Sequence, residues 1–345
     1  MTLTDFFLIV CLAASAATST VLVFTPLAQR LKLLDFPSEL KPHDKPTALI
    51  GGLAVYTAIL ACLLFIERPN KLDYLLTCVT LLMLLGLFDD VFHLPVWPRI
   101  ICQIGTILTM MVGAEVWIND FSPIAVLPAE PSLAAYTLTV LIGVFVINAF
   151  NMSDGMDGLA AINALSALAL IVAGQYYNTE IRQAPWIIGL ATGIVIFGVF
   201  NLGLIPRYKI FLGDGGSLPI GFLLFWLLVD FSQGGESPSI QPIMALWCLT
   251  VPLFDAVSVS CHRLVQGVSP TSGDNRHIHH KLQAINFSKL ETLLVLASVN
   301  IGLGCFGIAL AILTTEWISL IFYGCSFLVF HFLHNAIPHK RQSHN

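Results

Sequence analysis

Long apolar stretches alternate with short polar, proline-rich or glycine-rich segments along almost the whole chain. A helix that crosses the hydrocarbon core of a bilayer needs about 20 mostly apolar residues, and about eleven runs of that kind are present. Lipid offers no partner for open backbone groups, so each run is expected to be helical. The predicted spans are residues 5–28, 48–66, 72–88, 98–118, 134–150, 158–176, 185–204, 214–231, 241–262, 291–313 and 316–335. The pattern predicts an all-α polytopic membrane protein.

The connections between the runs are too short to hold a separate soluble domain. We predict one integral-membrane domain over residues 1–345, of which residues 336–345 form a short tail. The first run begins at Asp5 without a basic segment before it, and it is too long for the apolar core of a signal peptide. It is therefore predicted to be the first span.

Composition agrees with this picture and removes other classes of protein. Hydrophobic residues make up 56% of the chain and charged residues 11%, which is too few to cover a soluble globule of this length. The same figures exclude a disordered chain and a nucleic-acid binder with a basic face. The eight cysteines are scattered without a C-x-x-C pair, so neither a disulfide framework nor a zinc site is indicated.

The distribution of Lys and Arg predicts the orientation. If the N-terminus is outside, thirteen of the sixteen basic residues fall in inner connections or at inner helix ends. The positive-inside rule then predicts a cytoplasmic C-terminus. In this orientation nearly all the polar motifs lie at cytoplasmic helix ends, as expected for an interfacial enzyme. A carrier would instead place acids near the bilayer midplane.

Two adjacent carboxylates, Asp89 and Asp90, close the third run. A helix C-terminus carries partial negative charge, so an acidic pair there is unfavourable unless a cation or a substrate compensates it. The simpler interpretation is that both acids only mark the membrane boundary. We consider them candidate catalytic groups.

Polar residues then recur at every third position after the fifth run, at Asn148, Asn151, Asp154 and Asp157. This spacing keeps them near one face of a helix or a 3₁₀ turn. Asp157 is also a suitable N-cap for the next span, but capping explains only that residue. The segment is a candidate substrate site.

A glycine-flanked carboxylate, Asp214, opens the eighth run, with Arg207 and Lys209 just before it. Capping by Asp214 or Ser217 is the simpler interpretation. A helix N-terminus beside a carboxylate also suits a phosphate held next to a metal ion. Lys45, in the first inner loop, is predicted to be either a membrane anchor or part of a basic lip for an anionic substrate.

Three histidines within four positions, His277, His279 and His280, follow Arg276 in the loop after the ninth run. Such a cluster binds either a transition metal or phosphate and sugar oxygens. The neighbouring Arg276 and Lys281 favour an anion. The histidines at the end of the chain are predicted to be incidental, and they are His331, His334, His339 and His344.

Taken together and in this order, these motifs resemble those of the polyprenyl-phosphate N-acetylhexosamine-1-phosphate transferases. The resemblance covers about Leu34 to Leu282. Related phospho-N-acetylmuramoyl-pentapeptide transferases usually have three consecutive histidines, whereas this chain has His277-Ile278-His279-His280. The resemblance is therefore stronger to the N-acetylglucosamine branch.

The resemblance implies a reaction in which UDP-N-acetylglucosamine and undecaprenyl phosphate give N-acetylglucosaminyl-pyrophosphoryl-undecaprenol and UMP. It also implies Mg²⁺, with Mn²⁺ as a substitute, a bacterial inner membrane, and the first step of a cell-envelope polysaccharide of the O-antigen or common-antigen type. A homodimer is compatible with it. Another UDP-N-acetylhexosamine stays open as the donor, and the alternative from a different class is a transporter of nucleotide sugars or of the lipid carrier.

Roles for individual residues also follow from the resemblance. Asp214 is expected to bind the metal with help from Asp90, and Asp89 to orient or deprotonate the lipid phosphate. Asp154 is expected to act with them as a catalytic group beside the diphosphate. Direct transfer and an aspartyl-phosphate intermediate both stay open. The expected substrate-binding residues are Asn148, Asn151, Asp157, Lys45, Arg207, Lys209, Arg276, His277, His279 and His280.

Overall fold

The computed structural model describes residues 2–37, 45–63, 70–127, 130–177, 185–233, 238–269 and 276–338. Most of the tail predicted for residues 336–345 lies outside these ranges. Within them, eight helices are long and apolar enough to cross a membrane. They are α1 (Leu3–Leu27), α3 (Asn70–Phe92), α4 (Val96–Ala114), α5 (Leu133–Met152), α6 (Leu159–Tyr177), α8 (Asp214–Gln233), α12 (Lys289–Leu313) and α13 (Glu316–Ala336).

Two shorter apolar helices and one bent pair complete the bundle. The short helices are α2 (Gly51–Leu63) and α7 (Pro185–Asn201), and the pair is α9 (Pro242–Cys248) with α10 (Thr250–Val265). Every predicted run therefore falls on a helix or on this pair. The chain is an all-α, multi-pass membrane protein, as predicted, while the count of eleven spans and the orientation stay predictions.

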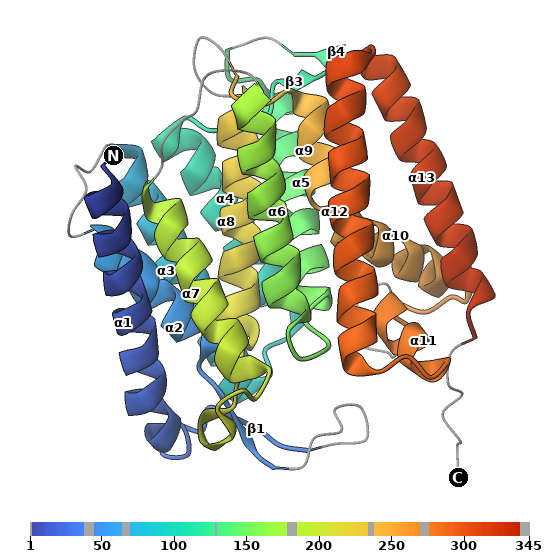
Figure 1. Ribbon diagram of the computed structural model, residues 1–345. Coiled ribbons are helices and arrows are strands. Elements are labelled where there is room, and N and C mark those ends of the chain that lie inside the picture. The colour runs from blue at the N-terminus through green and yellow to red at the C-terminus, as the bar shows by residue number, and fades with distance from the viewer. Residues whose placement is uncertain are drawn as a thin grey trace.

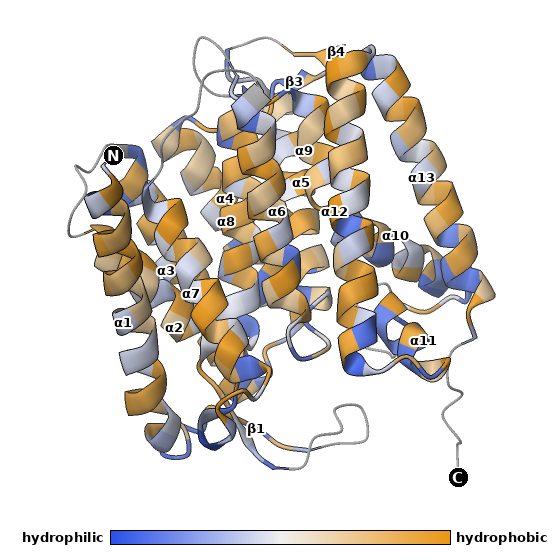
Figure 2. Ribbon diagram, viewed as in Figure 1, coloured by the Kyte–Doolittle hydropathy of each residue, from blue (hydrophilic) through white to orange (hydrophobic). Residues whose placement is uncertain are grey.

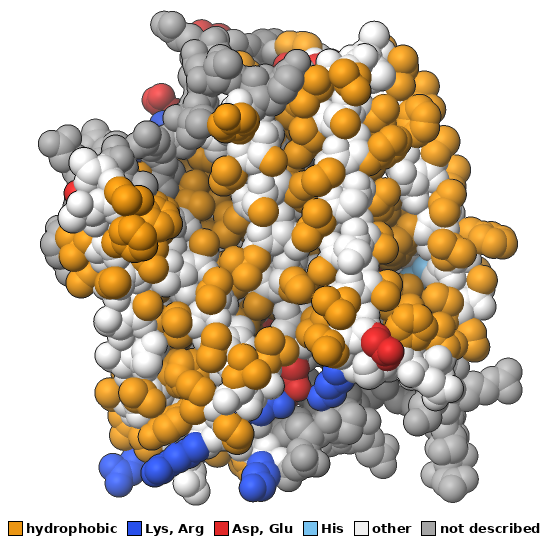
Figure 3. Space-filling model, in the orientation of Figure 1, with side chains coloured by type: hydrophobic (Ala, Val, Ile, Leu, Met, Phe, Trp, Pro, Cys, Tyr) orange, Lys and Arg blue, Asp and Glu red, His pale blue; other side chains and the backbone are white. Residues whose placement is uncertain are grey.

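The helices stand side by side (Figure 1), and hydrophobic residues predominate along most of them (Figure 2). Figure 3 shows hydrophobic side chains over most of one face, with Lys and Arg gathered along its lower edge. We call this the basic end of the bundle. A protein surrounded by lipid is expected to expose apolar side chains at its sides and polar ones at its ends.

Helix α8 is the centre of the bundle. Nearly all of its residues are buried, from Gly215 to Ser232, and it packs against α2, α3 and α5. Its sequence has no polar face along most of its length, which is typical of a helix enclosed by other helices. This position fixes the N-terminus of α8 among the ends of its neighbours.

The bend of 74° between α9 and α10 was not expected from the run at 241–262. Pro252 has no N–H, so an unbroken helix would lose a hydrogen bond here. The freed polar groups find other partners: the Thr250 hydroxyl donates to the Trp247 carbonyl at 2.9 Å, and the Val251 N–H donates to Asn300 of α12 at 3.1 Å. Helix α10 therefore runs across the bundle beside α13 (Figure 1).

Short elements join the helices at both ends. A small sheet at the basic end has the order β1-β2-β5, where β1 is Leu34–Asp35, β2 is Thr47–Leu49 and β5 is Ile210–Phe211. Strand β2 is antiparallel to β1 and parallel to β5, which brings the start of α2 beside the start of α8. The remaining elements are a hairpin of β3 (Asp120–Phe121) and β4 (Ala125–Val126), the 3₁₀ helix η1 (Pro206–Tyr208) and α11 (Ile278–Ala284).

Candidate active site

The acidic pair at the end of α3 meets the beginning of α8. Asp90 accepts hydrogen bonds from the backbone N–H groups of Asp214 at 2.9 Å and Gly215 at 3.1 Å. A side chain from another helix thus caps α8 and faces its positive end. The charge of Asp90 at the unfavourable end of α3 is therefore compensated within the protein.

Asp89, which is buried, lies beside an arginine. Its carboxylate is 2.7 Å from the Arg99 guanidinium of α4, and it also accepts the Leu94 N–H at 2.7 Å. The same guanidinium is 3.5 Å from the Asp214 carboxylate, and Asn151 donates to Asp214 at 3.3 Å. Asp89, Asp90, Asp214, Arg99 and Asn151 form what we call the acidic site. Arg99 was not among the predicted site residues, because in the sequence it looks like an ordinary inner charge.

Two glycines allow the close approach that builds this site. A Cβ on Gly52 of α2 would lie 2.3 Å from the Gly215 carbonyl oxygen, and one on Gly86 of α3 would lie 2.2 Å from the Asp214 carbonyl oxygen. Any side chain at either position would push the first turn of α8 away. The carboxylates can converge only because both positions are glycine.

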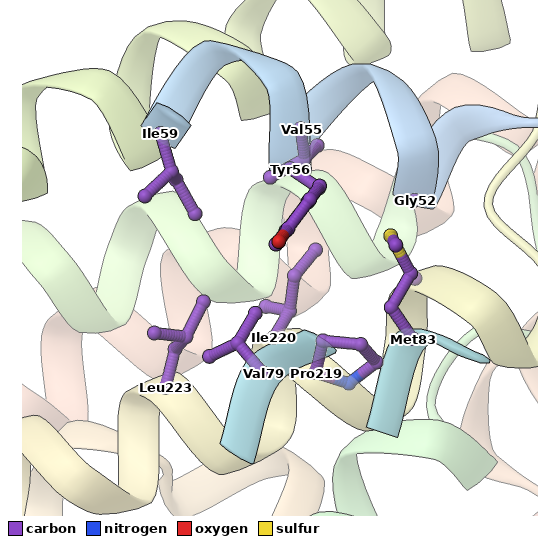
Figure 4. Close-up of a pocket in the computed structure, with 10 residues that line it drawn as sticks. Gly52, Val55, Tyr56, Ile59, Val79, Met83, Pro219, Ile220 and Leu223 are labelled. Atoms are coloured by element: carbon purple, nitrogen blue, oxygen red, sulfur yellow. The ribbon is translucent and has the colours of Figure 1, made fainter. Parts of the chain in front are cut away.

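A small hollow lies next to this turn, between α2, α3 and α8 (Figure 4). Its lining is apolar apart from the hydroxyl of Tyr56, which lies 2.6 Å from the Thr80 hydroxyl, so it does not suit a nucleotide. The polar chemistry lies instead where Asp89 and Asp214 share Arg99, and none of these three residues lines the hollow.

The acidic site suits a divalent cation whose coordination shell is completed by the substrate. Three carboxylates lie close enough to interact, with one guanidinium between two of them. Among the described side chains, no group of three His, Cys, Asp or Glu forms a ready metal cage. Mg²⁺ usually takes one or two carboxylates and completes its shell with water and phosphate oxygens, so this donor set fits it.

The segment between α5 and α6 spreads its polar residues over several partners. Asn148 exchanges hydrogen bonds with buried Gln103 of α4, and its Nδ2 donates to Gln103 Oε1 at 2.7 Å. Asn151, one turn later, reaches Asp214. The Gly158 N–H donates to Asn201 at 2.6 Å, and the Asn201 amide donates to Ile210, which fixes this loop against β5. Asn201 was not among the predicted site residues.

Asp157 lies between two lysines. Its carboxylate is 2.9 Å from Lys209 and 3.0 Å from Lys289, the first residue of α12. The predicted grouping of Asp157 and Lys209 in one site is therefore present in the structure, and Lys289 joins it. We call these three residues the lysine clamp.

The histidine loop is the third part of the site. His279 is buried, and a Cβ on Gly155 would lie 2.3 Å from its Nε2, so the two loops touch at this point. Burial, together with the nearby His280, lowers the pKa of His279 to about 3, so this ring is neutral at physiological pH. It can therefore exchange hydrogen bonds with a ligand but brings no charge.

Two residues outside the predicted site hold this loop. Asp255 of α10 lies 2.7 Å from His277, and His334 of α13 lies 3.5 Å from Asp255. The prediction that His334 is incidental was wrong, because this ring is buried and contacts both Asp255 and Lys281. His339 and His344 lie outside the described residues. Sequence alone gave no signal for His334, since its partners are 53 and 79 positions away.

The remaining predicted residues lie in the connections between the helices. Lys45 and Arg207 are exposed, and Arg207 lies over the Tyr208 ring at 5.6 Å. Arg276 donates to Gln266 beyond the end of α10. Asp154 lies in the loop after α5, between Asn151 and Gly155. Their roles in binding or catalysis stay predictions.

Comparison with known proteins shows the family to which the chain belongs. The family described as glycosyl transferase family 4 matches residues 72–232, which contain Asp89, Asp90, Asn151, Asp157 and Asp214. The undecaprenyl-phosphate alpha-N-acetylglucosaminyl 1-phosphate transferase of Yersinia pestis is 32% identical over 314 residues, or 88% of this chain and 84% of that protein. The chain belongs to this transferase family.

Two further relatives have the same name. The Escherichia coli K12 protein is 31% identical over 313 residues, covering 88% of this chain and 84% of its own length. The Haemophilus influenzae protein is 30% identical over 294 residues, covering 84% and 82%. The family resemblance inferred from the motifs is thus confirmed, and the chain is a transferase of glycosyl transferase family 4.

Proposed function

We propose that this enzyme transfers N-acetylglucosamine 1-phosphate from UDP-N-acetylglucosamine to undecaprenyl phosphate and releases UMP. The observation that carries the proposal is the convergence of Asp89, Asp90 and Asp214 at one end of a membrane bundle, beside Arg99 and Asn151. The names of its family members support the two substrates.

The proposed reaction needs a site that receives a lipid and a water-soluble substrate together. The basic end of the bundle carries Lys209 and Lys289, whose charges attract a nucleotide diphosphate. The excess of Lys and Arg at the predicted inner ends supports a cytoplasmic location for this face. The apolar sides of the helices keep the acceptor lipid in the bilayer beside it.

We assign a divalent cation, Mg²⁺ or Mn²⁺, to Asp214, where it would neutralise the diphosphate and the developing charge of the transferring phosphoryl group. Asp90 holds the backbone of Asp214 and so aims that carboxylate. Its own contact with the metal stays a prediction. Arg99 is placed to hold the lipid phosphate near Asp89.

Asp89 then orients the attacking oxygen of the lipid phosphate. A phosphate monoester is largely ionised near neutral pH, so a base contributes less here than alignment does. The lysine clamp and the histidine loop bind the nucleotide sugar. When the nucleotide binds, the Asp157 carboxylate would give up its ion pair with one lysine and accept a hydrogen bond from the uracil edge. That lysine would then bind the diphosphate.

The test is nucleotide release by the purified protein. With undecaprenyl phosphate and Mg²⁺, we expect UMP from UDP-N-acetylglucosamine and much less from UDP-glucose or UDP-galactose. UDP-N-acetylgalactosamine reports on the donor alternative that the sequence left open. Release of UDP would indicate sugar transfer without the phosphate, and uptake into vesicles without any UMP would indicate a transporter.

A further inference from the structure

Asp255 is a buried acid that the proposed mechanism does not yet use. It lies in α10 and is 4% exposed. A carboxylate at such depth is costly unless its oxygens are paired and hydrogen-bonded. Its contacts therefore indicate which parts of the protein it connects.

Both oxygens of Asp255 face the histidine loop. Oδ2 lies 2.7 Å from Nδ1 of His277, and Oδ1 accepts the Ile278 N–H at 2.8 Å. Because α11 begins at Ile278, Asp255 caps this helix from another helix. One carboxylate thus fixes both the His277 ring and the start of α11.

The last helix supports the same carboxylate. Lys281, also buried, donates to Nδ1 of His334 at 3.1 Å and to the His334 carbonyl oxygen at 2.5 Å. An ammonium group only donates, so Nδ1 of His334 is the acceptor and its ring proton is on Nε2. That nitrogen lies 3.5 Å from Oδ1 of Asp255. Lys281, His334, Asp255 and His277 therefore form one polar chain across α11, α13 and α10.

We propose that Asp255 is a positioning residue for His277, and that His334 and Lys281 hold Asp255 in place. With Nδ1 of His277 engaged by Asp255, Nε2 is the ring nitrogen that faces the phosphates of the nucleotide sugar. The inference rests on the proposed function. It gives the last helix, α13, a part in the active site, although α13 contributes no predicted substrate-binding residue.

The test is a double-mutant cycle in the full-length enzyme, with UMP release as the readout. Asp255→Asn and His277→Asn should each lower kcat/KM by about tenfold or more. Asp255→Asn should change kcat and KM in the same proportion as His277→Asn does. The double variant should lose no more than His277→Asn alone, because Asp255 acts through that ring.

A merely structural role gives a different result. If Asp255 only anchors α11, its removal also displaces Arg276, His279 and His280, so the losses add in the double variant. Additive losses, or wild-type kinetics in Asp255→Asn, would overturn the inference. A wild-type enzyme that releases no UMP would instead contradict the proposed function and, with it, this inference.

A second pair of variants keeps the test usable if Asp255→Asn does not fold. His334→Leu removes the donor behind Asp255, whereas His334→Gln keeps one donor and one acceptor. We expect His334→Leu to lower kcat/KM and His334→Gln to restore most of it. Equal activity of both with the wild type would overturn the role of α13. Asp230→Asn, which removes a carboxylate bound to Lys71 near the other end of α8, is the matched control.

Discussion

Asp90 accepts the backbone N–H of Asp214 at 2.9 Å, so the end of α3 caps the beginning of α8. The two residues are 124 positions apart in the chain. Asp90 thereby sets the direction of the carboxylate that we assign to the metal. Asp90 therefore positions the site, whereas Asp214 is the residue that we assign to the metal.

Replacement of Asp90 should reveal this supporting role. Asp90→Ala removes an N-cap and should lower the free energy of unfolding by about 1 kcal/mol, and it should also reduce UMP release. Asp90→Asn keeps one acceptor oxygen and should retain more of the stability. Thermal unfolding in detergent measures the first effect, and equal stability of Asp90→Ala and the wild type would contradict the capping role.

Arg99 neutralises Asp89 and Asp214, so its removal should make stability depend more on a divalent cation. In Arg99→Ala the carboxylates of the acidic site repel one another without compensation. Added Mg²⁺ should therefore raise the melting temperature of Arg99→Ala more than that of the wild type. Lys71→Ala, which breaks an ion pair with Asp230 elsewhere, is the control. Identical responses in all three proteins would argue against a cation at this site.

Gly155 lies where the loop after α5 meets the histidine loop. A Cβ there would lie 2.3 Å from Nε2 of His279, so Gly155→Ala should displace this ring. We expect UMP release to fall on the order of 10- to 100-fold while the protein stays folded. Gly302→Ala, where nothing lies within 4 Å, should leave activity unchanged. Full activity of Gly155→Ala would show that the position of the His279 ring does not matter for the reaction.

The buried His279 ring should make stability pH-dependent. Its folded pKa of about 3 lies below the ordinary value of 6.5, so the unfolded chain takes up a proton that the folded chain refuses. The stability that depends on this ring being neutral is fully present above pH 6.5 and is lost as the pH falls from 6.5 towards 3. Melting temperatures at pH 7.5 and pH 5 should therefore differ less in His279→Gln than in the wild type. An equal difference in both proteins would show that the ring is not buried as a neutral group.

Much of the fold could be predicted from the sequence, because lipid imposes a simple rule on long apolar runs. Each predicted run contains a helix, although the run at 241–262 breaks at Leu249, three residues before Pro252. In a sequence, a proline is compatible both with a bend inside one helix and with the first turn of a new helix. Pro252 alone therefore does not predict the break. The bend depends on Asn300, a distant partner for the Val251 N–H.

The acids of the site could also be predicted, because unpaired charge is rare in membrane helices. Asp89, Asp90 and Asp214 do converge, and Asn151 joins them. Four residues that contact the predicted site residues or support those contacts were not predicted from the sequence. Arg99, Lys289, Asp255 and His334 each look ordinary in sequence, and their importance depends on contacts between distant helices.

The most direct test follows the phosphorus atom that is attached to the sugar. UDP-N-acetylglucosamine labelled at this β-phosphate is incubated with the enzyme, undecaprenyl phosphate and Mg²⁺, and the lipid fraction is counted. We predict that the label moves to the lipid with release of unlabelled UMP, and that Asp214→Asn abolishes the transfer without unfolding the protein. Label that stays on the nucleotide, or full transfer by Asp214→Asn, would contradict the assignment.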